Sequence, residues 1–213
     1  MSRSSRSFFV TFLVVALLLS AAPEASNRLA LAPGDPAPRL RGLTLDRERW
    51  HAEWDKGTFT LVNFWATWCE PCKAEMPALQ KLHAANADKG LQVVGMLMDP
   101  VKDDELRAFL GPLALTYPII RPDAYVNKDW GGVVVMPITF LVDRQGKIVR
   151  RYVGATPEQV AGLVTDVEAV LDGRPLGTMV LPDQPGFVGD EERLKIKEEQ
   201  EAKDKPGPAP SGD

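Results

Sequence analysis

The feature that most limits how this chain can fold is the pair Cys69 and Cys72, the only two cysteines among its 213 residues. A β-rich apolar run, 58–64, precedes the pair, and a segment with apolar residues at helical spacing, 72–85, follows it. Cysteines three apart at the start of a helix lie on one face, with their Cα atoms near the ~5.5 Å that a disulfide prefers. The sequence therefore predicts a strand, a cysteine pair able to form a disulfide, and a helix in direct succession.

The position of each cysteine indicates its chemistry. Cys69 falls where the strand ends and the helix begins, and there the free backbone N–H groups and the helix dipole stabilise a thiolate. Cys72 lies one turn further along and is expected to be more shielded. Pro71 suits the first turn of a helix, where its missing N–H is not needed. We therefore expect Cys69 to be the nucleophile and Cys72 the resolving thiol.

Other uses of a cysteine pair fit this chain less well. A structural disulfide that closes so short a loop would add little stability. Zinc would need two further ligands, and His51 and His83 are not spaced as a pair. Covalent haem attachment would need a histidine directly after the second cysteine, where Lys73 stands. Redox chemistry is the favoured use, with no metal and no cofactor.

Strands and helices alternate along the rest of the chain. Further strands are predicted at 92–98, 117–120, 138–142 and 148–153. A short helix follows Asp103 or Asp104, either of which could cap it. The last helix begins with a capping box made by Thr156 and Gln159, and Gly173 ends it. This order predicts an α/β sandwich around a mixed sheet.

The N-terminus carries an export signal. Arg3 and Arg6 precede an apolar run, 8–19, which small residues follow. The run is short for a membrane span, and the cleavage sites after it are weak. Residues 1–25 are therefore either a cleaved signal peptide or an N-terminal membrane anchor, with a slight preference for the anchor. In both cases the rest of the chain is exported.

Breakers and composition divide the remaining chain. The expected parts are a linker at 26–38, one folded domain at 39–173 and a largely disordered tail at 174–213. The net charge is −4 and there is no basic stripe, which argues against a nucleic-acid partner.

The segment TLVNFWATWCEPCKAEMPAL around the cysteines resembles the thioredoxin superfamily, and within it the exported TlpA/ResA/CcmG (DsbE) family of thiol-disulfide oxidoreductases. The likeness runs from GDPAPRLRGLTL through GVVVMPITFLVDRQGKIVRRYVG to the last helix, which is most of residues 34–172. The resemblance implies a thioredoxin-like fold, with a central mixed β-sheet flanked by helices and an α/β insert before a cis-proline.

The resemblance also implies a substrate groove beside the cysteines. Met136 and Pro137 look like the family's cis-proline segment, which would place a cis Pro137 beside Cys69 in space. The backbone of Met136 would then pair with an extended substrate strand. The groove would be completed by three residues of the cysteine loop: Trp68, Glu70 and Pro71. A place in the core is an equally open interpretation for Trp68.

Glu75 is the expected proton acceptor for Cys72. Thioredoxin carries a buried aspartate in the strand before its motif, and here that position is Asn63, which cannot take a proton. A glutamate shortly after the second cysteine is typical of the exported group, and Glu75 matches it. The alternative is that Glu75 is a solvated residue of the helix face.

Charge near the cysteines bears on the direction of electron flow. Glu70 and Glu75 place negative charge there, which destabilises a thiolate and predicts a reductant. The resemblance implies reduction of protein disulfides, in apocytochrome c or a copper-site cysteine pair, at the periplasmic or extracytoplasmic face of the bacterial inner membrane. Electrons would come from a membrane thiol-disulfide carrier of the DsbD/CcdA kind.

Three other functions stay open. A disulfide-forming oxidase of the same fold would differ in its reduction potential. A copper-binding oxidase-assembly factor would use methionines near Cys69, for which Met76 and Met136 are the candidates. A peroxiredoxin-type enzyme would not normally carry its reactive cysteine in a W-C-x-P-C motif.

Overall fold

The structure is a computed structural model that describes residues 31–177. The predicted signal or anchor at 1–25 and nearly all of the predicted tail lie outside the described residues. Within 31–177, no helix is both long enough and apolar enough to cross a membrane. The helices and strands all belong to one compact unit, which ends at Pro175.

Seven strands form one mixed sheet in the order β2-β1-β5-β4-β3-β6-β7. Their bounds are β1 (Arg41–Leu43), β2 (Arg49–His51), β3 (Phe59–Trp65), β4 (Leu91–Leu97), β5 (Ile119–Pro122), β6 (Ile138–Val142) and β7 (Ile148–Val153). Strand β3 runs parallel to β4 and antiparallel to β6. Six of its seven residues are buried, as expected for a strand covered on both faces. The strand that leads to Cys69 is therefore a rigid, central part of the fold.

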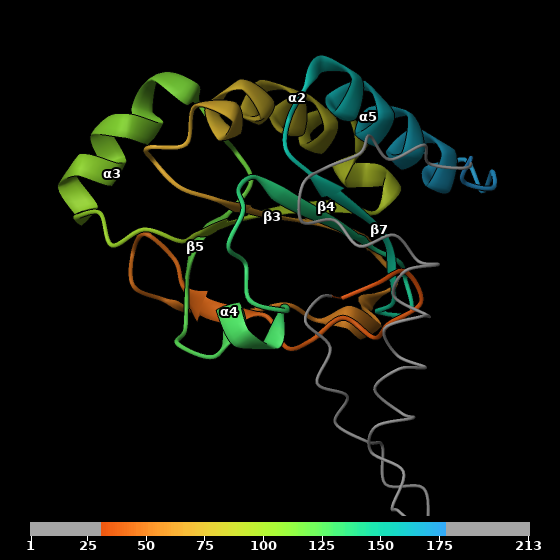
Figure 1. Cartoon of the computed structure of the whole chain (residues 1–213), viewed down its shortest axis with the longest axis horizontal. Helices are drawn as coiled ribbons and strands as arrows, with labels where there is room; N and C mark the ends of the chain where they lie inside the picture. The colour runs from red at the N-terminus through yellow and green to blue at the C-terminus, as the bar shows by residue number, and fades with distance from the viewer. Residues whose placement is uncertain (1–30, 178–213) are drawn as a thin grey trace, which may run out of the picture. The chain divides into compact units, whose positions relative to one another are not determined.

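Helices lie on both sides of the central strands (Figure 1). Their bounds are α2 (Glu70–Asn86), α3 (Asp103–Leu110), α4 (Val126–Asp129) and α5 (Pro157–Leu171). Three single-turn 3₁₀ helices occur at η1 (Trp54–Lys56), η2 (Ala87–Lys89) and η3 (Gly111–Leu113). In Figure 1, α2 and α5 lie on one side of β3 and β4, and α4 lies on the other. Helix α2 buries Met76, Leu79 and Leu82, the apolar face that the spacing predicts.

Most predicted elements occur within a few residues of their expected positions, and the thioredoxin-like α/β fold is confirmed. The capping box of α5 is also confirmed. Thr156 Oγ1 accepts a hydrogen bond from Gln159 N at 3.3 Å, and Thr156 N donates to Gln159 Oε1 at 2.9 Å. Between β4 and Pro137 the chain forms α3, β5 and α4, which is the expected α/β insert.

One helix begins differently from the prediction. The N-cap of α3 is Lys102, no side chain caps it, and Asp103 is its first residue. The carboxylate of Asp103 instead accepts hydrogen bonds from Arg47 at 2.7 Å and from Arg121 at 2.8 Å. These ion pairs hold Asp103 away from the cap position and connect α3 to the β1–β2 turn and to β5.

Residues 34–37, which fall within the predicted linker, are hydrogen-bonded to the β6–β7 hairpin. Gly34 N donates to Ile148 O at 2.7 Å, and Ala37 N donates to Gly146 O at 2.8 Å. The hairpin turn follows Val142, which is paired with Thr60 near the start of β3. These contacts therefore lie at the end of β3 opposite to the cysteines.

Candidate active site

The cysteine pair lies at the junction of β3 and α2, as the sequence predicts. Cys69 is the N-cap residue of α2, with extended backbone angles. Its backbone N–H donates to Ala66 O at 3.1 Å, so the loop from β3 makes a tight turn before the helix. Its sulfur accepts a hydrogen bond from Cys72 N at 3.3 Å. The helix N-terminus thus presents a backbone donor to Cys69 Sγ, which is the arrangement that stabilises a thiolate in the reduced protein.

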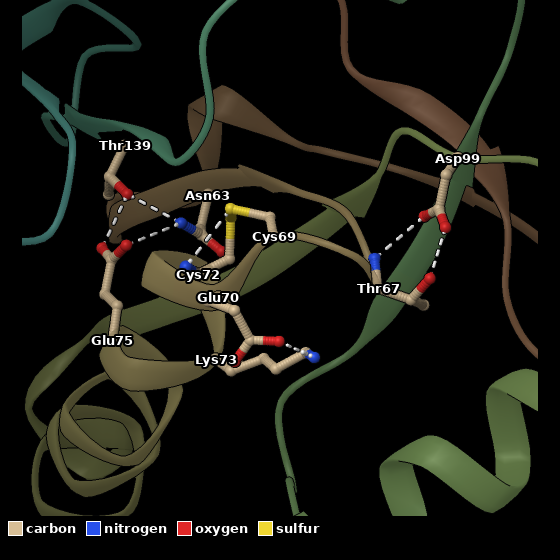
Figure 2. Close-up of a disulfide and its surroundings, with 9 residues drawn as sticks. All are labelled: Asn63, Thr67, Cys69, Glu70, Cys72, Lys73, Glu75, Asp99 and Thr139. Atoms are coloured by element: carbon tan, nitrogen blue, oxygen red, sulfur yellow. Dashed lines mark hydrogen bonds and ion pairs between the residues drawn. A yellow bond between two sulfur atoms is a disulfide. The ribbon is translucent and has the colours of Figure 1, made fainter.

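The two cysteines form a disulfide, with their Cα atoms 5.3 Å apart (Figure 2). Cys69 is 4% exposed and Cys72 is 2% exposed. In the disulfide form, burial therefore hardly distinguishes them. What distinguishes them is position, since Cys69 caps the helix and Cys72 lies inside its first turn.

Glu75 is buried, with only 2% of its surface exposed, so the alternative of a solvated helix residue is wrong. Figure 2 shows its carboxylate directed toward Thr139 and Asn63, away from Glu70. Thr139 Oγ1 donates to Glu75 Oε1 at 3.0 Å. Asn63 Nδ2 lies 3.5 Å from Glu75 Oε2 and 2.8 Å from Thr139 Oγ1. Three elements, α2, β3 and β6, therefore meet in one buried polar network next to the disulfide.

This environment gives Glu75 an unusual affinity for a proton. Burial raises the pKa of Glu75 to about 7, although the hydrogen bonds from Thr139 and Asn63 act in the opposite direction. Tyr117 is affected in turn, because burial and the nearby Glu75 carboxylate raise the pKa of its hydroxyl. A carboxyl group with a pKa near neutrality can both accept and release a proton at physiological pH.

Thr139 is a site residue for which the sequence gives no direct signal. It lies opposite Asn63 in the antiparallel register of β3 and β6, and both side chains are buried. Only the pairing of strands far apart in the chain brings them together. With the register known, Thr139 follows directly from the position of Asn63.

Glu70 and Glu75 differ in their electrostatic surroundings. The Glu70 side chain is 80% exposed and pairs with Lys73, whose Nζ lies 2.5 Å from Glu70 Oε1. The cation opposes the effect of Glu70 on a nearby thiolate. The hydrogen-bond partners of Glu75 are neutral, so no cation compensates its charge, but its raised pKa leaves the carboxyl group only partly ionised near neutral pH.

The peptide bond between Met136 and Pro137 is cis, as the resemblance implies. Ile138 is paired with Phe64, so Pro137 lies beside the end of β3 from which the cysteine loop departs. Pro137 is buried, while Met136 is partly exposed. The cis-proline segment, which leads into β6, and the cysteine loop, which follows β3, therefore lie at the same end of these two central strands.

The two tryptophans of the motif have different environments. Trp65 is fully buried and stacks on Phe109 with ring centroids 5.8 Å apart. Trp68 is 66% exposed, so of the two interpretations left open for it, a place in the core is wrong. Val134 and Val135, just before the cis-proline, are also exposed. Large apolar side chains are thus exposed on both segments at this end of β3 and β6.

Comparison with known proteins agrees with this geometry. The Redoxin family model matches residues 32–171. The chain is 37% identical over 130 residues to thioredoxin-like protein YneN of Bacillus subtilis, which covers 60% of this chain and 75% of YneN. It is 29% identical over 135 residues to thiol-disulfide oxidoreductase ResA of Bacillus thuringiensis, which covers 63% of this chain and 78% of ResA.

Solved structures show the same likeness. A Chlorobium tepidum protein assigned as thiol:disulfide interchange protein DsbE is 29% identical, with a TM-score of 0.60 over 67% of this chain and 99% of that protein. A thiol:disulfide interchange protein from Bacteroides sp. is 27% identical, with a TM-score of 0.58 over 67% of this chain and 92% of that protein. The chain belongs to the Redoxin family, and it is a thiol-disulfide oxidoreductase of the thioredoxin-like fold with its cysteine pair at Cys69 and Cys72.

Proposed function

We propose that the chain reduces disulfides of exported proteins, with Cys69 as the attacking thiol, Cys72 as the resolving thiol and Glu75 as the proton acceptor. The observation that carries the proposal is a buried carboxyl group, Glu75, one helical turn beyond Cys72 and hydrogen-bonded only to neutral side chains among the described residues. Such a group can take the proton of a shielded thiol without leaving a charge in contact with water.

The reaction proceeds in two exchange steps. The Cys69 thiolate attacks one sulfur of the substrate disulfide, a mixed disulfide forms, and the second substrate sulfur leaves as a thiolate. Cys72 then gives its proton to Glu75 and attacks the Cys69 sulfur, which releases the first substrate sulfur. The substrate gains two electrons, and the protein loses two as its own disulfide forms. Two electrons from a donor dithiol restore the reduced protein.

The substrate would lie against the exposed segments of the site. Trp68 and Met136 would contact it from the two sides, and an extended substrate strand would pair with the Met136 backbone beside cis Pro137. Glu70 and Pro71 are exposed in the first turn of α2 and would form the rim of this groove.

The proposed location is the periplasmic or extracytoplasmic face of the inner membrane. Its support is the sequence of residues 1–25, and relatives named ResA and DsbE are consistent with it. We propose apocytochrome c or a copper-site cysteine pair as the substrate and a membrane carrier of the DsbD/CcdA kind as the electron donor. We also propose a domain at 39–173 with a tail at 174–213 and a linker at 26–38, of which residues 34–37 are hydrogen-bonded to the β6–β7 hairpin.

Trapping of the mixed disulfide tests the proposal. Cys72→Ser should accumulate a covalent complex with an exported protein that has a C-x-x-C pair, because nothing resolves it. Cys69→Ser is the matched control and should trap none. Equal trapping by both variants would overturn the assignment of roles.

The attachment to the membrane needs a separate test. The mature N-terminus is read from the membrane and the soluble fractions of the native cell. An intact N-terminus in the membrane fraction is expected for the anchor. A soluble form that begins between residues 22 and 27 would refute it.

A disulfide-forming oxidase is the second candidate, and one observation favours it. The Lys73 ammonium beside Glu70 partly cancels the negative charge that argued for a reductant. The reduction potential of the pair separates the two functions, since a reductant has a potential well below those of oxidising proteins of this fold. The copper-factor alternative loses one of its candidate ligands, because Met76 is fully buried in the core.

A further inference from the structure

The loop that carries Trp68 and Cys69 is fastened to the neighbouring strand by one carboxylate. Asp99 lies two residues beyond the end of β4, and its two oxygens accept from both donors of Thr67. The Thr67 backbone N–H donates to Oδ1 at 3.2 Å, and the Thr67 hydroxyl donates to Oδ2 at 2.5 Å (Figure 2). Thr67 and Asp99 are 32 residues apart in the chain and are both half-buried.

This attachment extends the β3–β4 pairing into the active-site loop. Met98 N donates to Trp65 O at 2.9 Å, so the two chains are still hydrogen-bonded immediately before Asp99. Ala66 and Cys69 are buried, but the packing of Trp68 contributes little to holding the loop, because its side chain is 66% exposed. Hydrogen bonds to an ionised acceptor are stronger than neutral ones, so the carboxylate is an effective anchor for Thr67.

We propose that Asp99 is a positioning residue for Cys69. By holding Thr67, it keeps Cys69 at the N-cap of α2, where the sulfur meets the Cys72 N–H. In the reduced protein this contact stabilises the Cys69 thiolate. The inference rests on the proposed role of Cys69 as the attacking thiol. Neither Asp99 nor Thr67 belongs to the Cys-x-x-Cys motif.

The hydrogen bonds from Thr67 to Asp99 and the negative charge of Asp99 change the pKa of Cys69 in opposite directions. A looser loop would raise the pKa of Cys69, because the sulfur loses the backbone donor Cys72 N–H. Loss of a nearby negative charge would lower it. The sign of the change in Cys69 pKa on substitution therefore identifies which effect dominates.

Four variants separate the contributions. Asp99→Ala removes both hydrogen bonds and the charge. Asp99→Asn removes the charge, while its amide can accept from the Thr67 N–H and donate to the Thr67 hydroxyl oxygen. Thr67→Val removes only the hydroxyl bond at nearly constant volume. Thr67→Ser is the matched control, since it retains the hydroxyl.

The test is the pH dependence of iodoacetamide alkylation, measured on the reduced full chain in a Cys72→Ser background so that Cys69 is the single thiol. We expect Asp99→Ala to raise the Cys69 pKa by about one pH unit and to slow alkylation at neutral pH by up to about tenfold. Thr67→Val should show a smaller change in the same direction, and Thr67→Ser and Asp99→Asn should show no rise.

A Cys69 pKa in Asp99→Ala that is no higher than in Asp99→Asn would overturn the proposal, because both variants remove the charge and only Asp99→Ala removes the hydrogen bonds to Thr67. If Asp99→Ala does not fold, Thr67→Val decides, with a raised pKa expected and an unchanged pKa contradicting the proposal. Alkylation does not require a substrate protein. Failure of Cys72→Ser to capture a partner would therefore count against the proposed function and leave this measurement intact.

Discussion

Thr139 on β6 donates its hydroxyl hydrogen to the buried carboxylate of Glu75 on α2, across 3.0 Å. Asn63 on β3 contacts both of them. The network joins a helix to two strands directly behind the disulfide, so the ionisation of Glu75 is coupled to the position of all three elements. Titration of the two cysteines and Glu75 in the reduced protein should accordingly be collective rather than independent.

Replacement of Glu75 by glutamine should slow the resolving step. The amide keeps the shape of the side chain but cannot take the Cys72 proton. We expect disulfide exchange near neutral pH to be about 100-fold slower, at the lower end of the range usual for loss of a general base, and the reduction potential to lose part of its pH dependence. Stopped-flow exchange with a model disulfide between pH 5 and 9 measures this. Glu168→Gln on the exposed face of α5 is the control. An unchanged pH–rate profile would mean that the proton goes to water.

The stability of the oxidised protein should fall as the pH rises through neutrality. The pKa of Glu75 is about 7 in the folded protein against an ordinary value of 4.5, so the folded state holds this proton more firmly than the unfolded state. The contribution is complete below pH 4.5 and is lost as the pH rises through about 7. It amounts to roughly 3 kcal/mol. Urea unfolding at pH 5 and pH 8 measures it, and Glu75→Gln should abolish this part of the difference. Equal pH dependence in the two proteins would contradict the prediction.

Substitution of Thr139 by valine should raise the pKa of Glu75 further. The hydroxyl bond lowers that pKa, and valine removes it while preserving the volume of the buried side chain. The Glu75 titration, followed by NMR of its side-chain carboxyl carbon, should move upward by about one pH unit. Thr139→Ser keeps the donor and should titrate like the native protein. A downward movement in Thr139→Val would exclude the hydroxyl as a donor to the carboxylate.

Loss of the Lys73 cation should make the pair a stronger reductant. Without Lys73, the exposed Glu70 carboxylate acts on Cys69 without compensation, so the thiolate is less stable and the disulfide is favoured. Because the ion pair is exposed, we expect the reduction potential of Lys73→Gln to fall by only about 10 mV. Equilibration with glutathione or dithiothreitol measures the potential. Lys81→Gln, an exposed change two turns further along α2, should have no effect. A higher potential in Lys73→Gln would show that Lys73 does not stabilise the thiolate.

The elements around the cysteines could be predicted because their signals are local. The apolar run of β3, the cysteine spacing and the capping box of α5 each fall within a few residues of sequence. Strands β1 and β2 escaped prediction because each has only three residues, most of them exposed, and no alternation can be read over so short a span. Asp103 was expected as a helix cap because its two arginine partners are distant in sequence.

The residues that surround the site were harder to predict than the cysteines. Burial of Glu75 depends on which face of α2 meets the sheet, and helical spacing alone leaves a glutamate free to be solvated. Thr139 depends on strand register, where a slip of one residue would turn it to the opposite face. Asp99 and Thr67 meet only because β3 and β4 are adjacent and parallel. Contacts of this kind come from tertiary structure, and no short motif specifies them.

The backbone bonds of residues 34–37 to the β6–β7 hairpin have a consequence for orientation. Residues 34–37, where the polypeptide enters the domain, lie in space near the first residues of β3. The disulfide lies beyond the last residue of that strand. Seven residues of β3 separate the two ends, a length of about 20 Å at the usual rise per residue. A membrane anchor of the kind proposed would hold the domain by the side at which residues 34–37 lie. The side that carries Cys69 and Cys72 would then be directed away from the point of attachment, toward incoming proteins.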